Sequence, residues 1–245
     1  DYVKGWSDLD TFIVIKKDCV NNPDRLLKLR DLLFKSKRFL YDIDPLQHHG
    51  SIIISEHDLD NYCQAYFPVP VFRYAKSFFK NDRISNIKAR NFSGEAYKKL
   101  FWFVSYFRKL NSEKNRSLGS YGMKTLLHSI ALLPSLYLQA KGTLVYKKFS
   151  FETAKKDFKK NLWKVIDQVS IIRSNWKPFK TMPLVGAFSS LNPLLCYQLN
   201  SRFVDLFNGV VKDNKIDAQK LIDGAYALSE DAWDKIKENV KSKKL

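Results

Sequence analysis

Cysteine is scarce in this chain. Three residues, Cys19, Cys63 and Cys196, occur at wide and unrelated spacing. An odd number of distant thiols does not form a disulfide framework, and no CxxC pair of the metal-ligand type is present. The scarcity predicts a reducing, cytoplasmic setting in which each cysteine serves as a small buried hydrophobe.

Long hydrophobic runs are also missing. The most apolar stretch, residues 126–138, is interrupted by histidine, serine and proline, whereas a membrane-spanning helix needs about 20 consecutive apolar residues. We therefore expect no membrane span. With 45% apolar and 27% charged residues over 245 positions, the composition is that of a folded globular chain. No signal-peptide pattern follows Asp1, and because the chain does not begin with Met we expect residues upstream of it.

Acidic residues are few beside the basic ones. The chain has 42 Lys and Arg against 25 Asp and Glu, which gives a formal net charge of +17. The excess is uneven, because residues 101–200 carry sixteen positive and four negative charges. This basic middle predicts an anionic partner, such as nucleic acid, nucleotide phosphates, a lipid surface or an acidic protein. Lysines on solvated helix surfaces explain the same excess equally well.

The opening third of the chain is predicted to contain strands around one helix. The β-branched and aromatic run at 11–15 predicts a buried strand, and Asn-Asn-Pro-Asp at 21–24 starts a helix to about Lys37. Further strands are expected at 39–43 and 51–55. The apolar side chains of the helix are expected to face the core; they are Leu26, Leu27, Leu29, Leu32, Leu33 and Phe34.

From Gly94 onward the apolar spacing is helical. Gly142 is placed to end the second of these helices, which we expect to kink at Pro134. The fold class is therefore α+β, a small mixed sheet with helices in a domain at 1–85, followed by an all-helical domain at 90–245. A polar connection at 81–93 separates them. The expected helices span about 94–110, 120–141, 150–173, 194–211 and 215–241.

The residues that indicate chemistry stand near the start, where Gly5-Trp6-Ser7-Asp8-Leu9-Asp10 runs into the first apolar strand. Residues i and i+2 of a strand point to the same face, so Asp8 and Asp10 are expected to present paired carboxylates. Close carboxylates repel each other, and a divalent cation relieves the repulsion. Such oxygen ligands suit Mg²⁺, which often shares substrate phosphates.

This block resembles the nucleotidyltransferase superfamily, which includes DNA polymerase β and the aminoglycoside adenylyltransferases. Its signature is a Gly-Ser turn, then Ser-Asp-h-Asp (h, hydrophobic) and an apolar strand. Here Ser7-Asp8-Leu9-Asp10 and Phe12 to Ile15 match the central part, while the Gly-Ser turn is absent. Gly5 precedes the motif but is not that turn. The resemblance implies a nucleotidyltransferase-type sheet whose truncated start lies before Asp1.

A third acidic residue comes from a later strand in that family. Asp42 and Asp44, in Tyr-Asp-Ile-Asp at 41–44, are both candidates, and Glu56 is a more remote one. His48 and His49 beside them could contact phosphate or transfer a proton, and equally could bond the backbone of their turn. Trp6 is expected to pack rather than to stack on a base.

The later part of the chain carries a weaker resemblance. The basic segment at 137–152 is similar to the helical C-terminal region of bacterial nucleotidyltransferase-domain proteins, where a helical domain helps to form the substrate cleft. The two resemblances together lead us to expect that Ser7 and Gly5, from the motif, and Lys147 and Lys148, from the basic segment, bind nucleotide. Solvated surface lysines remain the alternative for the last two.

The resemblance implies an ATP-binding or other NTP-binding transferase that uses two Mg²⁺ ions, held by Asp8, Asp10 and Asp44 or Asp42. The acceptor stays open between an RNA 3′ end, a small hydroxylated molecule such as an aminoglycoside and a protein side chain, and the basic middle favours RNA slightly. We also allow for a homodimer. The rival interpretation is a catalytically inactive module of the same fold that binds nucleic acid or a protein, for example within a toxin–antitoxin pair.

Overall fold

The computed structural model describes most of the chain, and its elements give an α+β class, with many helices and one two-stranded sheet. No helix within the described ranges combines the length and the apolar character needed to cross a membrane. The described residues are 6–7, 10–43, 51–64, 67–77, 87–90, 93–113, 118–176 and 216–242.

The chain divides into two compact units, each built from separate stretches of sequence. Unit 1 combines residues 1–58, 118–125 and 173–216. Unit 2 combines residues 59–117, 126–172 and 217–245. The predicted domain boundary at residues 85–90 stays a prediction.

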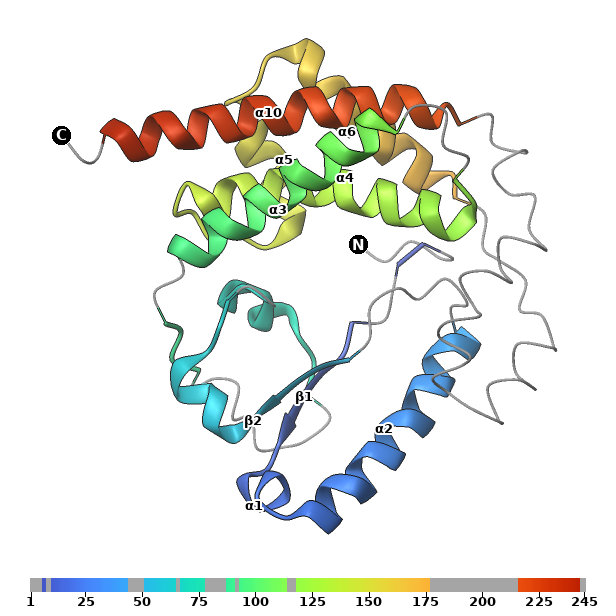
Figure 1. Cartoon of the computed structure of the whole chain (residues 1–245), viewed down its shortest axis with the longest axis vertical. Coiled ribbons are helices and arrows are strands. Elements are labelled where there is room, and N and C mark those ends of the chain that lie inside the picture. Colours follow the sequence, from blue (N-terminus) through green and yellow to red (C-terminus); the bar gives the residue numbers. More distant parts are fainter. Residues whose placement is uncertain are drawn as a thin grey trace. The chain divides into compact units, whose positions relative to one another are not determined.

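The sheet of unit 1 consists of β1 (Phe12–Ile15) and β2 (Ile52–Ser55), which pair in parallel (Figure 1). Phe12 lies opposite Ile52 and Ile15 lies opposite Ser55. Parallel neighbours need a long crossover, and the helices α1 (Lys17–Val20) and α2 (Pro23–Ile43) supply it. The strands predicted at 11–15 and 51–55 are confirmed.

Helix α2 begins as predicted but ends later. The backbone N–H of Arg25 donates to Asn22 Oδ1 at 3.0 Å, and Pro23 occupies the first turn. The helix then continues to Ile43, so the strand predicted at 39–43 is wrong. Extending a helix adds one hydrogen bond per residue fixed, whereas a strand needs a partner. The aromatic and β-branched residues at 39–43 therefore follow the helix already formed.

The apolar side chains of α2 are also more exposed than predicted. Leu27 is 51% exposed and Leu32 is 63% exposed. The described part of unit 1 has two short strands, which is too little sheet to cover a helix of 21 residues. The expectation that this whole set of side chains faces the core is therefore wrong.

Unit 2 contains the larger core. Helices α3 (Ser93–Ser112) and α10 (Ala218–Ser242) lie side by side and run in opposite directions (Figure 1). The ring of Trp233 lies 4.5 Å from that of Tyr97, centroid to centroid. Arg108 binds Glu230 through two hydrogen bonds of 2.6 and 2.8 Å. The helices predicted at 94–110 and 215–241 are confirmed.

Helix α4 (Ser120–Ala140) is buried on nearly all sides from residue 126 to residue 139, as expected of a helix at the centre of a core. Pro134 lies inside it, and Gly142 follows it with a φ of +93°, as predicted for its end. The single helix predicted near 150–173 is two helices, α5 (Lys147–Lys155) and α6 (Lys160–Ser174). The predicted helix at 194–211 lies outside the described residues.

The cysteine prediction is partly wrong. Cys19 and Cys63 are free thiols, as expected, but both are half-buried rather than buried. Cys63 Sγ donates to Glu95 Oε2 at 3.1 Å, and Glu95 also binds Arg90. A polar, partly solvated surrounding therefore takes the place of the apolar one predicted. Cys196 lies outside the described residues.

Candidate functional site

The segment that leads into β1 carries the predicted catalytic motif. Asp10 is exposed and lies two residues before the strand. The next residue, Thr11, accepts the N–H of Ile52 on its carbonyl oxygen at 2.8 Å, and its hydroxyl donates to Ser51 Oγ at 2.7 Å. The chain segments that lead into β1 and β2 therefore lie side by side at the amino edge of the sheet.

The other predicted catalytic carboxylates are not placed by the structure. Asp8 and Asp44 lie outside the described residues, as does Gly5. Asp42 falls in the last turn of α2 instead of on a strand, and its side chain is likewise not described. Of Asp8, Asp10, Asp42 and Asp44, only Asp10 has a side chain that the structure describes.

Glu56, the remote candidate for a third carboxylate, lies at the wrong edge of the sheet. It follows β2, and its Oε2 accepts the backbone N–H of Lys17, at the start of α1, at 2.9 Å. Asp10 precedes β1 in the same parallel pair, so the length of a strand separates the two carboxylates. At about 3.3 Å per residue, this separation is far greater than two ligands of one ion allow.

The remaining predicted residues divide between the two units. Ser7 is half-buried and belongs to unit 1 with Asp10. Lys147 and Lys148 form the first turn of α5 in unit 2. A role for these two lysines in binding the same nucleotide as Asp10 stays a prediction.

Beside the motif, the structure shows a cluster that the sequence did not reveal. Trp6 is 4% exposed, and its ring meets that of Trp176 edge to face at 5.1 Å. Packing, the role predicted for Trp6, is confirmed. The guanidinium carbon of Arg173 lies 5.8 Å from the centre of the Trp6 ring, within the range of a cation–π contact. All three residues belong to unit 1.

Two donors in this cluster have no acceptor among the residues that the structure describes. Arg173 Nε and Trp176 Nε1 are buried and make no hydrogen bond that the described part of the chain provides. Burial lowers the pKa of Arg173, because it disfavours the charged form. A buried N–H without a partner costs free energy, and an anionic oxygen would satisfy both groups. No motif in the sequence joins residues 6, 173 and 176, so folding alone brings them together.

A second buried cation lies in unit 1. Lys124, in the first turns of α4, is 1% exposed. Lysine is almost never fully buried without a compensating partner. The sequence gave no indication of this burial, because a lysine near the start of a mostly apolar helix also fits a solvated helix face.

The described residues hold no ready-made metal centre. Within the described ranges, no three His, Cys, Asp or Glu side chains gather as a metal site would require. The proposed ligand set has two members, Asp8 and Asp44, outside those ranges. The Mg²⁺ hypothesis therefore depends on the carboxylate oxygens of the sequence motif, which are the ligands that this ion prefers.

Comparison of the chain with protein-family models, with curated proteins and with solved structures finds no match. The functional argument therefore depends on the residues themselves and on their placement in unit 1.

Proposed function

We propose that this chain is a Mg²⁺-dependent nucleotidyltransferase with a nucleotidyltransferase-type sheet. It would move a nucleoside monophosphate from a nucleoside triphosphate to an acceptor hydroxyl and release pyrophosphate. The observation that carries the proposal is the position of Asp10, which ends a Ser-Asp-Leu-Asp motif two residues before β1 of a parallel strand–helix–strand unit. Such a reaction uses a cytoplasmic metabolite and fits the cytoplasmic setting that we propose.

The reaction needs an oxygen nucleophile, a leaving group and compensation of charge. The acceptor oxygen forms a bond to the α-phosphorus, the bond from that phosphorus to the bridging oxygen breaks, and pyrophosphate departs. The acceptor proton passes to a base, for which Asp44 or Asp42 is proposed. Bound Mg²⁺ would supply charge neutralisation, with Asp8 and Asp10 as its protein ligands.

Cationic groups in unit 1 support a polyanionic substrate. Arg173 places a partly buried guanidinium beside Trp6, one residue before the motif begins, and its Nε has no acceptor within the described residues. Arg is well suited to phosphate oxygens because its planar fork donates in pairs. We therefore add Arg173 to Ser7 and Gly5 as a proposed contact for the triphosphate.

A thermal-shift experiment tests nucleotide binding. Parent protein, Asp8→Asn and Asp10→Asn are melted with and without MgATP and MgGTP. A ligand that binds the native state stabilises it by about 2.7 kcal/mol at one hundred times its Kd. We expect one of the two nucleotides to raise the Tm of the parent, and to raise the Tm of either variant much less.

Asp31→Asn is the matched control. Asp31 is an exposed carboxylate on α2 with a side chain 61% exposed, paired with its neighbour Arg30. Its loss should leave the nucleotide response unchanged. Equal ligand-induced shifts in the parent, Asp10→Asn and Asp31→Asn would contradict the proposal and favour a module of the same fold that does not bind nucleotide through this motif.

A further inference from the structure

Unit 2 carries an exposed aromatic surface that the proposed reaction does not use. It consists of Tyr74, at the end of the short helix η2 (Val69–Tyr74), and Tyr146 and Phe149 at the start of α5. Tyr74 and Tyr146 stack with centroids 4.8 Å apart and planes inclined by 21°. Phe149 lies 6.0 Å from Tyr74 and 6.2 Å from Tyr146. We call these three residues the aromatic platform.

The platform remains open to solvent although its rings contact one another. Tyr74 is 56% exposed and Phe149 is 44% exposed. These two exposed rings come from segments more than seventy positions apart in the sequence, so the platform is a product of the tertiary fold. Exposed apolar side chains that gather in one place, rather than scatter singly, often mark a binding site.

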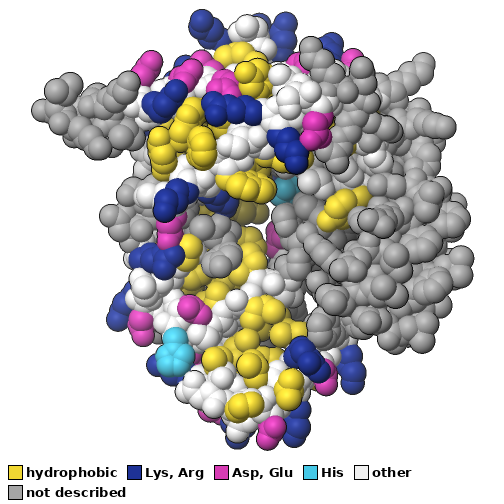
Figure 2. Space-filling model, viewed as in Figure 1, with side chains coloured by type: hydrophobic (Ala, Val, Ile, Leu, Met, Phe, Trp, Pro, Cys, Tyr) yellow, Lys and Arg dark blue, Asp and Glu magenta, His cyan; other side chains and the backbone are white. Residues whose placement is uncertain are grey.

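Basic side chains adjoin the platform in both segments. Arg73 and Lys76, both exposed, stand on either side of Tyr74 in the sequence, and Lys147 and Lys148 separate Tyr146 from Phe149. Figure 2 shows Lys and Arg side chains interspersed with exposed hydrophobic ones on the face of the molecule that it presents. Four basic residues thus lie within two positions of a platform ring in the sequence, and no acidic residue lies between them and that ring.

Two of these charges lie at the amino end of a helix. Lys147 and Lys148 occupy the first turn of α5, which has no acidic residue. The N-terminus of a helix carries a partial positive charge, so cations there are unfavourable and an anion is favourable. The single acidic residue of α5, Glu152, follows a turn later. An anionic partner at this end of α5 would therefore meet both the lysines and the positive end of the helix.

We propose that the aromatic platform binds single-stranded nucleic acid. Bases would stack on the open faces of Tyr74 and Phe149, while the phosphates of the backbone contact Arg73, Lys76, Lys147 and Lys148. Single strands offer unstacked bases together with negative charge, which is the combination that aromatic and basic side chains recognise. A duplex conceals its base faces. The proposal does not depend on nucleotidyl transfer, because unit 2 contains the whole platform.

Fluorescence anisotropy with a labelled single-stranded RNA decamer tests this proposal. The full chain should bind the RNA in about 50 mM salt, and its affinity should fall as salt rises because phosphate contacts release counterions. Removing a stacking ring by Tyr74→Ala or Phe149→Ala should weaken binding about tenfold each. Tyr74→Phe should bind like the parent, because it keeps the ring. The double variant Lys147→Ala/Lys148→Ala should reduce the salt slope by about 0.7 for each phosphate that the protein no longer neutralises.

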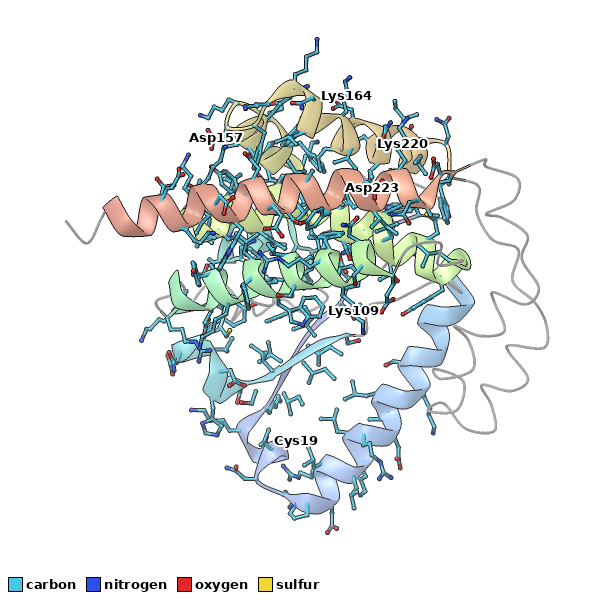
Figure 3. The ribbon with its side chains drawn as sticks, turned by 45° about the horizontal axis from the view of Figure 1, so that its top comes forward. Cys19, Lys109, Asp157, Lys164, Lys220 and Asp223 are labelled. Atoms are coloured by element: carbon cyan, nitrogen blue, oxygen red, sulfur yellow. The ribbon has the colours of Figure 1, made fainter. Side chains whose placement is uncertain are left out.

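Two variants serve as matched controls on the same unit. Trp102 is 62% exposed, and its ring contacts those of Phe103 and Tyr106 in its own helix. Lys164 is exposed on α6 and extends away from the helices in Figure 3. Trp102→Ala and Lys164→Ala should bind RNA like the parent. Circular dichroism on each variant separates a loss of binding from a loss of folding.

Three results would overturn the proposal. A parent protein that binds no RNA in low salt would exclude single-stranded nucleic acid as the occupant of the platform. Equal weakening by Trp102→Ala and Tyr74→Ala would show that general exposure, rather than the platform, matters. The third result is that inorganic polyphosphate displaces the labelled RNA as effectively as unlabelled RNA does, from the parent and from Tyr74→Ala alike. It would indicate a purely electrostatic surface without base stacking.

Discussion

At the scale of single residues, one buried hydroxyl links the end of α4 to the connection between α5 and α6. Tyr137 is 2% exposed and donates to Asp157 Oδ2 at 3.1 Å, and Lys141 Nζ reaches the same oxygen at 2.8 Å. Burial, followed by the hydrogen bond to Asp157, raises the pKa of Tyr137 far above its usual value. Burial alone would raise the pKa of Asp157, but the bonds from Lys141 and Tyr137 lower it below its usual value.

We expect Asp157→Ala to destabilise the chain by about 1–3 kcal/mol, because it leaves the Tyr137 hydroxyl buried without an acceptor. Urea unfolding at pH 7 measures the loss. Asp167→Ala is the control, since Asp167 is exposed and reaches Lys155 only at 4.0 Å; its effect should stay below about 1 kcal/mol. Asp157 is labelled in Figure 3. Equal effects of the two substitutions would contradict this account of the contact.

The lowered pKa of Asp157 predicts that the stability of the chain depends on pH. Its pKa in the folded chain lies below the usual 3.8, so its charged form contributes stability above that value and loses the contribution as the pH falls through the folded pKa. The difference in unfolding free energy between the parent and Asp157→Ala should therefore narrow below about pH 4. Urea titrations at pH 7 and in this acidic range measure it. A difference in unfolding free energy that widens as the pH falls below about 4 would contradict the expected direction.

Residue identity predicted packing better than it predicted polar contacts. Trp6 packs as expected because a large apolar ring gains free energy wherever it is buried. The half-buried state of Cys63 was not predictable, because it depends on Glu95, which lies 32 positions away. Arg173 gave no indication of its place beside Trp6 for the same reason. Contacts between distant residues depend on the tertiary fold, which local pattern does not specify.

At the scale of elements, one glycine accounts for the C-terminal end of α4. Gly142 has a φ of +93°, and the N–H of Thr143 donates to the Leu138 carbonyl oxygen at 2.8 Å, which closes the last turn. This geometry suits glycine because the left-handed region is unfavourable for other residues. Sequence alone predicted this end of the helix correctly.

Gly142→Ala should therefore destabilise the chain by about 1 kcal/mol, as measured by thermal or urea unfolding. Gly94→Ala is the matched control. Gly94 lies in α3, a Cβ there would meet nothing within 4 Å, and its φ is not positive. Alanine should be neutral or stabilising at that position, because it favours the helix. Similar losses at both glycines would contradict the conformational explanation.

The helices and strands also show where the local sequence pattern fails to predict secondary structure. The strands at β1 and β2 were predicted because a run of β-branched and aromatic residues is bounded by polar ones. The strand predicted at 39–43 has similar residues but directly follows a helix, and α2 extends through it. The local pattern at 39–43 fits either a strand or a helix, and these residues are helical because α2 continues through them. For Asp42 this places a candidate catalytic residue on a helix turn, a position that the sequence did not predict.

At the scale of the whole molecule, each unit combines a feature found in the sequence with one that only the fold reveals. The basic middle of the sequence includes Lys147 and Lys148 beside the aromatic platform. The Ser-Asp-Leu-Asp motif leads into the parallel strands, in the same unit as Arg173. Sequence predicted the motif and the excess of charge, whereas the platform and the Arg173 cluster required the fold.

The most direct test of the central claim is transfer of label from an α-labelled nucleoside triphosphate. The parent protein is incubated with Mg²⁺ and labelled ATP or GTP, with a short RNA or an aminoglycoside as acceptor, and pyrophosphate release is followed in parallel. We predict labelled product with one acceptor, an equal amount of pyrophosphate, and loss of both in Asp10→Asn but not in Asp31→Asn. A parent that transfers no label and releases no pyrophosphate with either acceptor, or an Asp10→Asn variant as active as the parent, would contradict the claim.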